Sequence, residues 1–437
     1  MTSSHHRRLR IPEWPTLLIS LCVLLIIGTP LVNWWQMNRN PVVHVPMPMM
    51  PVPNAFDYYV KAAKLIPYVD TSYVSGTYSV PTTDPTAILK LTASQRTAIL
   101  AVQPQVTALL TQGMQYPCVA PPIRSRRTLM PYLSKRRNMG RYFDILAKLS
   151  AAQGAWPASM EDSLLSMRVG ADSIHGSPLI GALVGEACES IGRKQARAAV
   201  DHLSPSEAHK ALAEMEDINA REVPCSQILQ EEKWTGMTSL AELFRTPNWR
   251  TQFVKENYAS EKKNVQNYTR FRLVFVHKRH SLARYAAYFD TCIIRSTGRF
   301  ALRKPAEPAE PDDIVSAAYS ISCDRAWLKS LQNEVGNRLL TMQLALQAYR
   351  GEHGAYPSTL AALVSAGYLH TLPDDPFALT GTFHYQTRKT GYLLYSLGPD
   401  CTDEGGTPIT DTKDPTKPAK ALQLDNRGDI VAGVNGI

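Results

Sequence analysis

The stretch of sequence that decides the fold runs from Asn337 to Val431. It reads NRLLTMQLALQAYRGEHGAYPSTLAALVSAGYL (337–369), then LPDDPFALTGTFHYQTRKTGYLLYSLGPDCTDEGG (372–406), then LDNRGDIV (424–431). A helical period, a Tyr-Pro turn, a short apolar segment, two strand-like segments and an acidic glycine-rich loop follow one another. This order predicts a small module in which helices accompany a β-hairpin.

A long amphipathic helix is expected at the start of this module. Apolar residues recur there at steps of three and four, as they do on one face of a helix: Leu328, Leu331, Val335, Leu339, Met342, Leu346 and Tyr349. We expect the helix to begin at Asp324 and to end at Gly351 or Gly354, since glycine commonly terminates helices.

A short helix and a hairpin are expected next. Ser358 is a helix cap for a segment that reaches Val364. The segments TFHYQ and GYLLYS flank TRKTG, with Gly391 beside the turn. We expect the long helix to lie across this small antiparallel sheet and to bury its apolar stripe there, in an α/β domain of residues 315–437.

The chain before this domain is expected to be helical over residues 54–302. Asn54 precedes apolar residues at helical spacing, and Ser204 precedes Pro205 and a first-turn acid, so both are expected to cap helices. The Pro-rich segment KPAEPAEPDDI (304–314) marks the boundary. The expected fold class is therefore α+β, mostly α: an N-terminal transmembrane helix, an all-α middle domain, and a long helix packed on a small antiparallel sheet.

The N-terminus contains a candidate membrane span at residues 14–36. No charged residue occurs from Trp14 to Asn38, and the centre reads LLISLCVLLII (17–27). Such a length is what a helix needs to cross a bilayer. The alternative is a cleaved signal peptide, but the apolar core is long for one and no small-x-small site follows it. The lipid bilayer is thus the first expected partner.

The charges around this span predict its orientation. Three arginines lie among residues 1–13, whereas Arg39 is the only cation soon after the span. By the positive-inside rule the short tail is cytoplasmic and the bulk of the chain is extracytoplasmic. The expected location is the inner (cytoplasmic) membrane of a bacterium, with a single pass. Residues 37–53, rich in Pro and Met, are expected to form an extended spacer.

The charge balance gives no indication of a nucleic-acid partner. The 437 residues carry a formal net charge of +9, but the cations are spread along the chain and no zinc-finger or RNA-binding signature is present. His277 and His280 have a spacing that can bind a metal on a helix face. Lys278 and Arg279 lie between them, however, and no third ligand is evident. A basic, solvated helix face is the expectation there.

The chain has seven cysteines, whose oxidation state depends on the cellular compartment in which the protein folds. Cys22 lies in the span. Six lie beyond it and allow fifteen connectivities: Cys118, Cys188, Cys225, Cys292, Cys323 and Cys401. We expect one or two disulfides in an exported chain and the remaining thiols to be small buried hydrophobic groups.

The order YRGEHGAYPSTLAALV, DDPF, FHYQ, YLLYSLGPD and DEGG resembles the periplasmic part of the major, G-type pseudopilins of type II secretion. The resemblance covers roughly the 95 residues quoted at the outset; the rest of the chain resembles uncharacterised membrane-anchored bacterial proteins. It implies a long helix packed on a small sheet and a calcium-binding acidic loop. The chain departs from the family in one respect, because here the long helix is far from the membrane span, which does not favour filament assembly.

Calcium is the expected cofactor of the acidic loop. Calcium prefers six to eight hard oxygen ligands on a flexible loop, and SLGPDCTDEGG with the later GDIV supplies carboxylates and carbonyls. The resemblance implies Asp400 and Asp429 as side-chain ligands, with Asp403 and the Leu397 carbonyl as further candidates. The alternative is a solvated acidic turn without an ion, since Cys401 and a long basic insert interrupt the loop.

No catalytic motif is present: the sequence has no GxSxG, HExxH, P-loop or GxGxxG. We therefore expect a membrane-anchored envelope protein with a structural or protein-interaction role, associated with a secretion or pilus-like system and with its envelope proteins, rather than an enzyme. The alternative is an exported, hydrolase-like enzyme with its site in the helical domain, which carboxyl groups of perturbed pKa inside a pocket would favour. A sensor ectodomain is a third interpretation, which the short cytoplasmic tail opposes.

Overall fold

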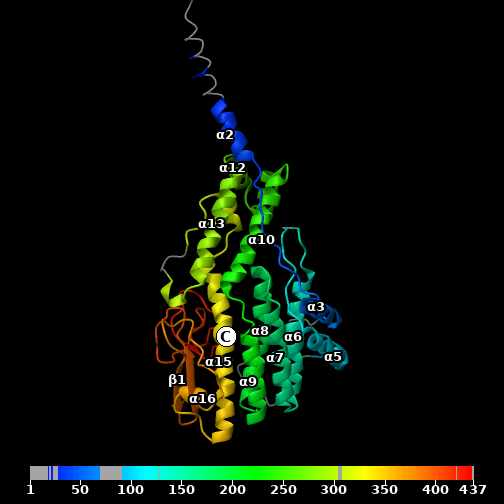
Figure 1. The fold of residues 1–437 in the computed structure, drawn as a ribbon, viewed down its shortest axis with the longest axis vertical. Helices are drawn as coiled ribbons and strands as arrows, with labels where there is room; N and C mark the ends of the chain where they lie inside the picture. The colour runs from blue at the N-terminus through cyan, green and yellow to red at the C-terminus, as the bar shows by residue number, and fades with distance from the viewer. Residues whose placement is uncertain are drawn as a thin grey trace, which may run out of the picture. The chain divides into compact units, whose positions relative to one another are not determined.

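The computed structural model (Figure 1) describes residues 18, 21–22, 28–68, 91–125, 127–303, 308–419 and 421–435. Helices make up most of these ranges, and a three-stranded antiparallel sheet accompanies them. The expected α+β class, mostly α, is confirmed.

The elements of the described ranges have the following bounds: α2 Thr29–Asn38, α3 Ala55–Leu65, α5 Ala93–Gly113, α6 Pro131–Ala152, α7 Trp156–Asp172, α8 Leu179–Val200, α9 Pro205–Asn219, α10 Cys225–Arg245, α11 Trp249–Asn257, α12 Lys263–Val274, α13 Lys278–Ser296, η3 Phe300–Leu302, α14 Ile314–Tyr319, α15 Cys323–His353, α16 Ala361–Ser365, β1 His384–Arg388, β2 Gly391–Ser396 and β3 Ile430–Val431.

The chain divides into two compact units. Unit 1 comprises Met1–His44, Ser239–Ala286 and Glu310–Ser320, and unit 2 comprises Val45–Thr238, Ala287–Ala309 and Ile321–Ile437. Helices α10 and α13 each have residues in both units.

Helices α6, α7 and α8 pack on one another in the core of unit 2, where α3 adds aromatic side chains and α5 adds aliphatic ones. Small residues allow α7 and α8 to approach closely. A Cβ on Gly192 would lie only 2.4 Å from the carbonyl oxygen of Ser163 on α7. The expected caps form as well: the Asn54 side chain accepts from the N–H of Phe56, and Ser204 and Glu207 form a capping box.

The long helix α15 has 31 residues and ends at His353, capped by Gly354, whose φ of 75° lies in the left-handed region. The hairpin forms as expected, with Tyr385 of β1 opposite Leu394 of β2. Helix α15 contacts β2, but it also packs extensively against α8 and α9. Its apolar stripe is therefore buried by helices as well as by the sheet, and residues 321–437 belong to the same compact unit as α6 to α9.

About half of the predicted span, residues 14–36, lies outside the described residues. Helix α2, with exposed Leu31, Trp34 and Trp35, covers its end. Among the helices described, none is long and apolar enough to span a bilayer. The following residues, 39–50, form neither helix nor strand.

Candidate functional site: the acidic loop and a charged cavity

Asp429, one of the expected calcium ligands, is completely buried beside β3. Its Oδ2 accepts hydrogen bonds from the backbone N–H groups of Glu404, Gly406 and Thr407, at 3.2, 2.8 and 3.2 Å. Its Oδ1 has no hydrogen-bond partner. The carboxylate therefore holds the acidic loop against the segment that leads into β3, while one buried oxygen stays unsatisfied.

Asp403, a second expected ligand, is turned toward the hairpin. Its Oδ1 accepts from the Tyr395 hydroxyl at 2.9 Å and from the Gly405 N–H at 2.9 Å. The ring Nδ1 of His384 lies 3.2 Å from its Oδ2. The Gly405 N–H, together with Tyr395 and His384, keeps the pKa of Asp403 below its ordinary value.

The remaining expected ligands are Asp400, whose charge acts on Glu404, and the Leu397 carbonyl. Burial and then the charges of Asp400 and Asp429 raise the pKa of Glu404 to about 6, so these carboxyl groups lie close enough to repel one another. The Oε2 of Glu404 is also buried without a hydrogen-bond partner. The Leu397 carbonyl accepts from its neighbour, the Ser396 hydroxyl, at 2.9 Å.

The donor chemistry of this loop suits a hard cation, because its oxygens are carboxylates and two of them are buried and unsatisfied. The geometry of these side chains, however, does not form a complete metal site. In the ranges that the structure describes, no group of three or more His, Cys, Asp and Glu side chains is placed to hold a metal ion. That statement includes His277 and His280, whose rings stack at 3.9 Å.

A second polar site, which the sequence did not predict, lies between α8 and α15. The buried charged residues of α8 are Glu186, Glu189 and Arg193, and their partners on α15 are Ser330, Asn333 and Asn337. Both sets follow steps of three and four, so each occupies one helix face. We call these six residues the polar seam.

Each charge in the polar seam is hydrogen-bonded across the two helices. Ser330 Oγ donates to Glu186 Oε1 at 2.8 Å, and Asn337 Nδ2 donates to Glu189 Oε2 at 2.7 Å. Arg193 Nη1 donates to the side-chain oxygens of Asn333 and Asn337 at 3.0 and 2.6 Å. Burial raises the pKa of Glu186 to about 7 and lowers that of Arg193 to about 10.

A cavity of about 310 Å³ adjoins this seam. Its wall is formed by the segment after α9, the turn after α13, and α15, and its polar lining includes Glu222, Arg299, Ser330, Glu334, Arg338 and Asp374. Ser330 and Glu222 also line a cavity of about 20 Å³ with Glu186 and Glu189, a volume that suits one water molecule. The Oε2 of Glu186 has no hydrogen-bond partner in the protein.

Glu222 and Glu334 form a carboxyl pair in the larger cavity. Burial is the main cause that raises the pKa of both carboxyl groups, and the charge of Glu334 acts on Glu222. Burial and then the Glu334 charge raise the pKa of Glu222 to about 9, although 37% of its side chain is exposed. Arg338 forms an ion pair with Glu334 and donates to the Asp374 carbonyl at 2.7 Å. The pair therefore holds a proton more readily than two exposed glutamates do.

A pair of carboxyl groups of raised pKa beside an arginine is an arrangement that can serve acid–base chemistry or the binding of a polar ligand. Sequence reasoning missed this pair because the two glutamates are far apart in the chain and each lies in a polar context. The sequence pattern that could have indicated a polar site is a second face of α15, where Ser330, Glu334 and Asn337 recur at steps of three and four beside the apolar stripe.

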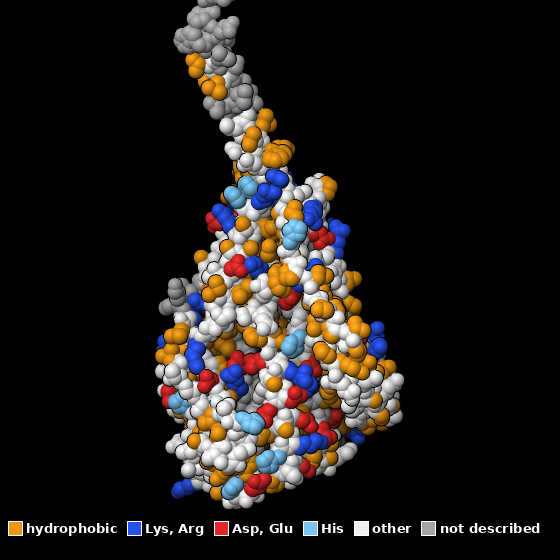
Figure 2. All heavy atoms as spheres, in the orientation of Figure 1, with side chains coloured by type: hydrophobic (Ala, Val, Ile, Leu, Met, Phe, Trp, Pro, Cys, Tyr) orange, Lys and Arg blue, Asp and Glu red, His pale blue; other side chains and the backbone are white. Residues whose placement is uncertain are grey.

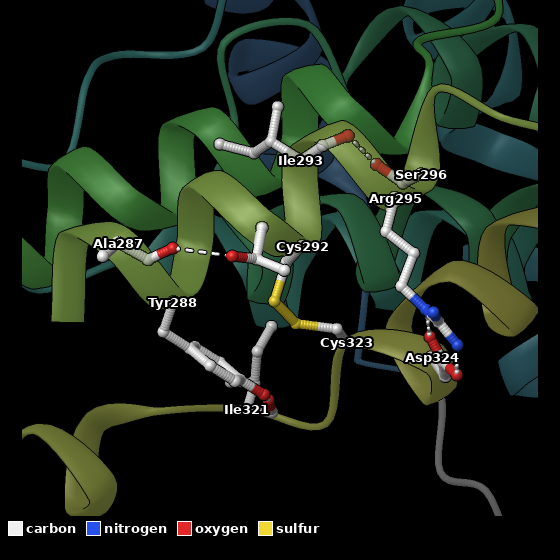
Figure 3. Close-up of a disulfide and its surroundings, with 10 residues drawn as sticks. Ala287, Tyr288, Cys292, Ile293, Arg295, Ser296, Ile321, Cys323 and Asp324 are labelled. Carbon is white, nitrogen blue, oxygen red and sulfur yellow. Dashed lines mark hydrogen bonds and ion pairs between the residues drawn. A yellow bond between two sulfur atoms is a disulfide. The ribbon is translucent and has the colours of Figure 1, made fainter. Parts of the chain in front are cut away.

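A disulfide joins Cys292 of α13 to Cys323, the first residue of α15 (Figure 3). Beside it, Arg295 forms a two-pronged ion pair with Asp324, with N···O distances of 2.6 and 2.8 Å. The hydroxyl of Tyr288 donates to the Ile321 carbonyl at 2.5 Å. The start of α15 is thus fixed to α13 by a covalent bond, an ion pair and a hydrogen bond.

Comparisons with known proteins identify no relative. No protein-family model matches the chain, no curated protein matches it, and no solved structure matches its fold.

Proposed function

We propose that this protein is a single-span envelope protein of a bacterial inner membrane, with its bulk outside the cytoplasm and a structural or protein-interaction role. The observation that carries the location is the Cys292–Cys323 disulfide. Disulfides persist in oxidising compartments and are rare in the cytosol. The basic tail and apolar span of residues 1–36 support the same topology.

The oxidation state of the cysteines in cells tests the location. Cells that express the full chain are quenched in acid, the protein is denatured, and its thiols are alkylated with a maleimide that adds mass, with and without prior reduction. We expect two of the seven cysteines to be blocked until reduction. The Cys401→Ser variant keeps the blocked pair and serves as the control. Seven reactive thiols without reduction would contradict the proposal.

The pseudopilin-like character of residues 315–437, and with it an association with a secretion or pilus-like system, also belongs to the proposal. Its support is the contact of α15 with β2 and the acidic loop that Asp429 holds closed. Calcium would neutralise the charges of Asp400, Glu404 and Asp429, and the two unsatisfied oxygens would coordinate the ion.

A calcium titration of the full chain tests this part. We expect calcium to raise the melting temperature and a chelator to lower it, because an ion that binds only the folded state stabilises it. Asp400→Ala should abolish the response, whereas Asp414→Ala, in the exposed insert where Asp414 pairs with Lys417, should keep it. An unchanged melting temperature with calcium and with chelator would refute the calcium site.

A second candidate function is that of an exported, hydrolase-like enzyme. The Glu222–Glu334 pair in the 310 Å³ cavity favours it, since a carboxyl group of raised pKa can act as a general acid. The test is a screen of ester, peptide and glycosidic substrates. Any turnover should be lost in Glu334→Gln and retained in Glu242→Gln, a residue of α10 outside the cavity. Absence of turnover across the screen, or turnover that survives Glu334→Gln, would exclude this role for the pair.

A further inference from the structure

Helix α12 has an uncovered apolar face in unit 1. Tyr268, Phe271, Val274 and the adjoining Phe275 are 63, 61, 52 and 64% exposed. With the rotation of an α-helix, these four positions fall within an arc of roughly 120°. The rings of Phe271 and Phe275 contact each other edge to face, with centroids 5.3 Å apart. We call these four residues the α12 face.

The opposite side of the helix is anchored. Thr269 and Leu273 are buried, and α12 packs against α11. The Nε of Arg250, on α11, donates to the Leu273 carbonyl at 2.9 Å. The helix is therefore held in one orientation, and the aromatic residues cannot turn inward without breaking these contacts.

Positive charge borders the α12 face on both sides. Arg270 and Arg272 are exposed and project to either side of the apolar arc, and Lys263 lies in the first turn. Residues 239–286 contain ten Lys and Arg against three Asp and Glu, a net of +7 out of +9 for the whole chain. Figure 2 shows Lys and Arg (blue), His (pale blue) and hydrophobic (orange) side chains around the C-terminal end of α2.

The end of α2 is bound next to this helix, within the same unit. Arg250, which holds Leu273, also donates from Nη2 to Asn38 Oδ1 at 3.1 Å. Lys278 donates from Nζ to Asn40 Oδ1 at 2.7 Å and to the Phe244 carbonyl at 2.8 Å. One arginine thus touches both the last residue of α2 and α12, and Figure 1 shows α12 just below the end of α2. The α12 face consequently lies close to the C-terminal end of the predicted membrane span, residues 14–36.

We propose that the α12 face is a membrane-interface element that inserts its aromatic side chains among the headgroups of the bilayer, with Arg270 and Arg272 on lipid phosphates. This inference rests on the proposed membrane span. Aromatic rings favour the depth of the bilayer interface, and a helix with an apolar face bordered by cations lies in the plane of an acidic membrane surface. The excess of cations over acids in residues 239–286 matches acidic phospholipid better than a protein partner of mixed charge.

Photo-crosslinking of the reconstituted full chain tests this inference. The photoreactive residue p-benzoyl-phenylalanine replaces Phe271 in one protein and Leu379 in another, because Leu379 is a comparably exposed apolar residue of unit 2, 57% exposed. Each protein is incorporated into vesicles of phosphatidylethanolamine with about 30% phosphatidylglycerol, an acidic surface. Flotation of the vesicles reports the anchor, and mass spectrometry of the irradiated protein reports the adducts.

We expect the chain to float with the vesicles, position 271 to form phospholipid adducts, and position 379 to form none. Arg270→Gln with Arg272→Gln should reduce the adducts at position 271. Flotation without lipid adducts at position 271 would overturn this inference and leave the anchor standing. Adducts to a second copy of the chain in place of lipid would overturn it in favour of a protein contact. A chain that does not float would overturn both the inference and the proposed anchor.

Discussion

Arg193 occupies the space in which a side chain at position 336 would lie. A Cβ on Gly336 would be 2.4 Å from Nε and 2.7 Å from Cζ of the Arg193 guanidinium. This close approach lets α15 pass directly over the buried arginine of α8. The close packing of α8 and α15 at the polar seam therefore depends on Gly336, which has no side chain.

The substitution Gly336→Ala should lower the free energy of unfolding by about 1–3 kcal/mol, because the added methyl group displaces a fully buried guanidinium in a packed interior. Chemical denaturation followed by circular dichroism measures the change. Gly298→Ala is the matched control, since the nearest atom to a Cβ there is 3.6 Å away. Equal stability of the two variants would show that Arg193 relocates without cost.

The substitution Asn337→Leu should cost about 1.5–3 kcal/mol of stability, since Asn337 bonds to both Glu189 and Arg193 and hydrogen bonds to charged groups are worth that much. Thermal and denaturant melts report the loss. Gln105→Leu, at an exposed position of α5, should be nearly neutral. An Asn337→Leu protein as stable as the parent would indicate that the seam is not a stabilising network.

Glu186 should make stability fall as the pH rises. Its pKa is raised from 4.5 to about 7 by burial, so the folded state holds a proton that the unfolded chain releases above about pH 4.5. Stability is greatest below that pH and declines toward pH 7, with a slope of up to about 1.4 kcal/mol per pH unit for one proton. Glu186→Gln should flatten this part of the curve of unfolding free energy against pH. A parallel curve for the variant would rule out Glu186 as the source.

Loss of the Cys292–Cys323 disulfide should cost about 2–4 kcal/mol, because it closes a loop across 31 residues of sequence and restricts the unfolded chain. The double variant Cys292→Ser, Cys323→Ser and the reduced parent protein should show the same loss in equilibrium denaturation. Cys401→Ser should leave stability unchanged, since Cys401 is a free thiol. If reduction leaves the unfolding midpoint in place, the disulfide does not contribute.

Local sequence patterns were sufficient for the long helix and the hairpin of the C-terminal part, whereas the expected cap at Ser358 was wrong, because α16 begins at Ala361 after Leu360. The period of Leu331, Leu339 and Leu346 gave helix α15, the glycine at 354 its end, and GYLLYS the strand β2. The helix caps at Asn54 and Ser204 were also predictable from the local sequence. These features depend on residues a few positions apart, which is the range over which hydrophobic period and capping act.

The tertiary pairing of α15 with α8 was not predictable in this way. The partners Glu189 and Asn337 are 148 positions apart, and each alone is an ordinary polar residue of a helix. Likewise, fifteen connectivities were open to the six cysteines beyond the span, and only the spatial proximity of α13 to the start of α15 selects Cys292 with Cys323. In the acidic loop, local order brought Asp400 and Asp403 near Glu404, but the hydrogen bonds of Asp429 to the loop amides required the fold.

The topology of the full chain tests the central proposal most directly. Intact spheroplasts that express the protein are treated with protease, and fragments are identified with antibodies to the N-terminal tail and to residues 421–435. We predict that every epitope beyond residue 40 is digested while the tail inside the cell is protected. Protection of residues 421–435 in intact spheroplasts, with digestion only after lysis, would contradict the account.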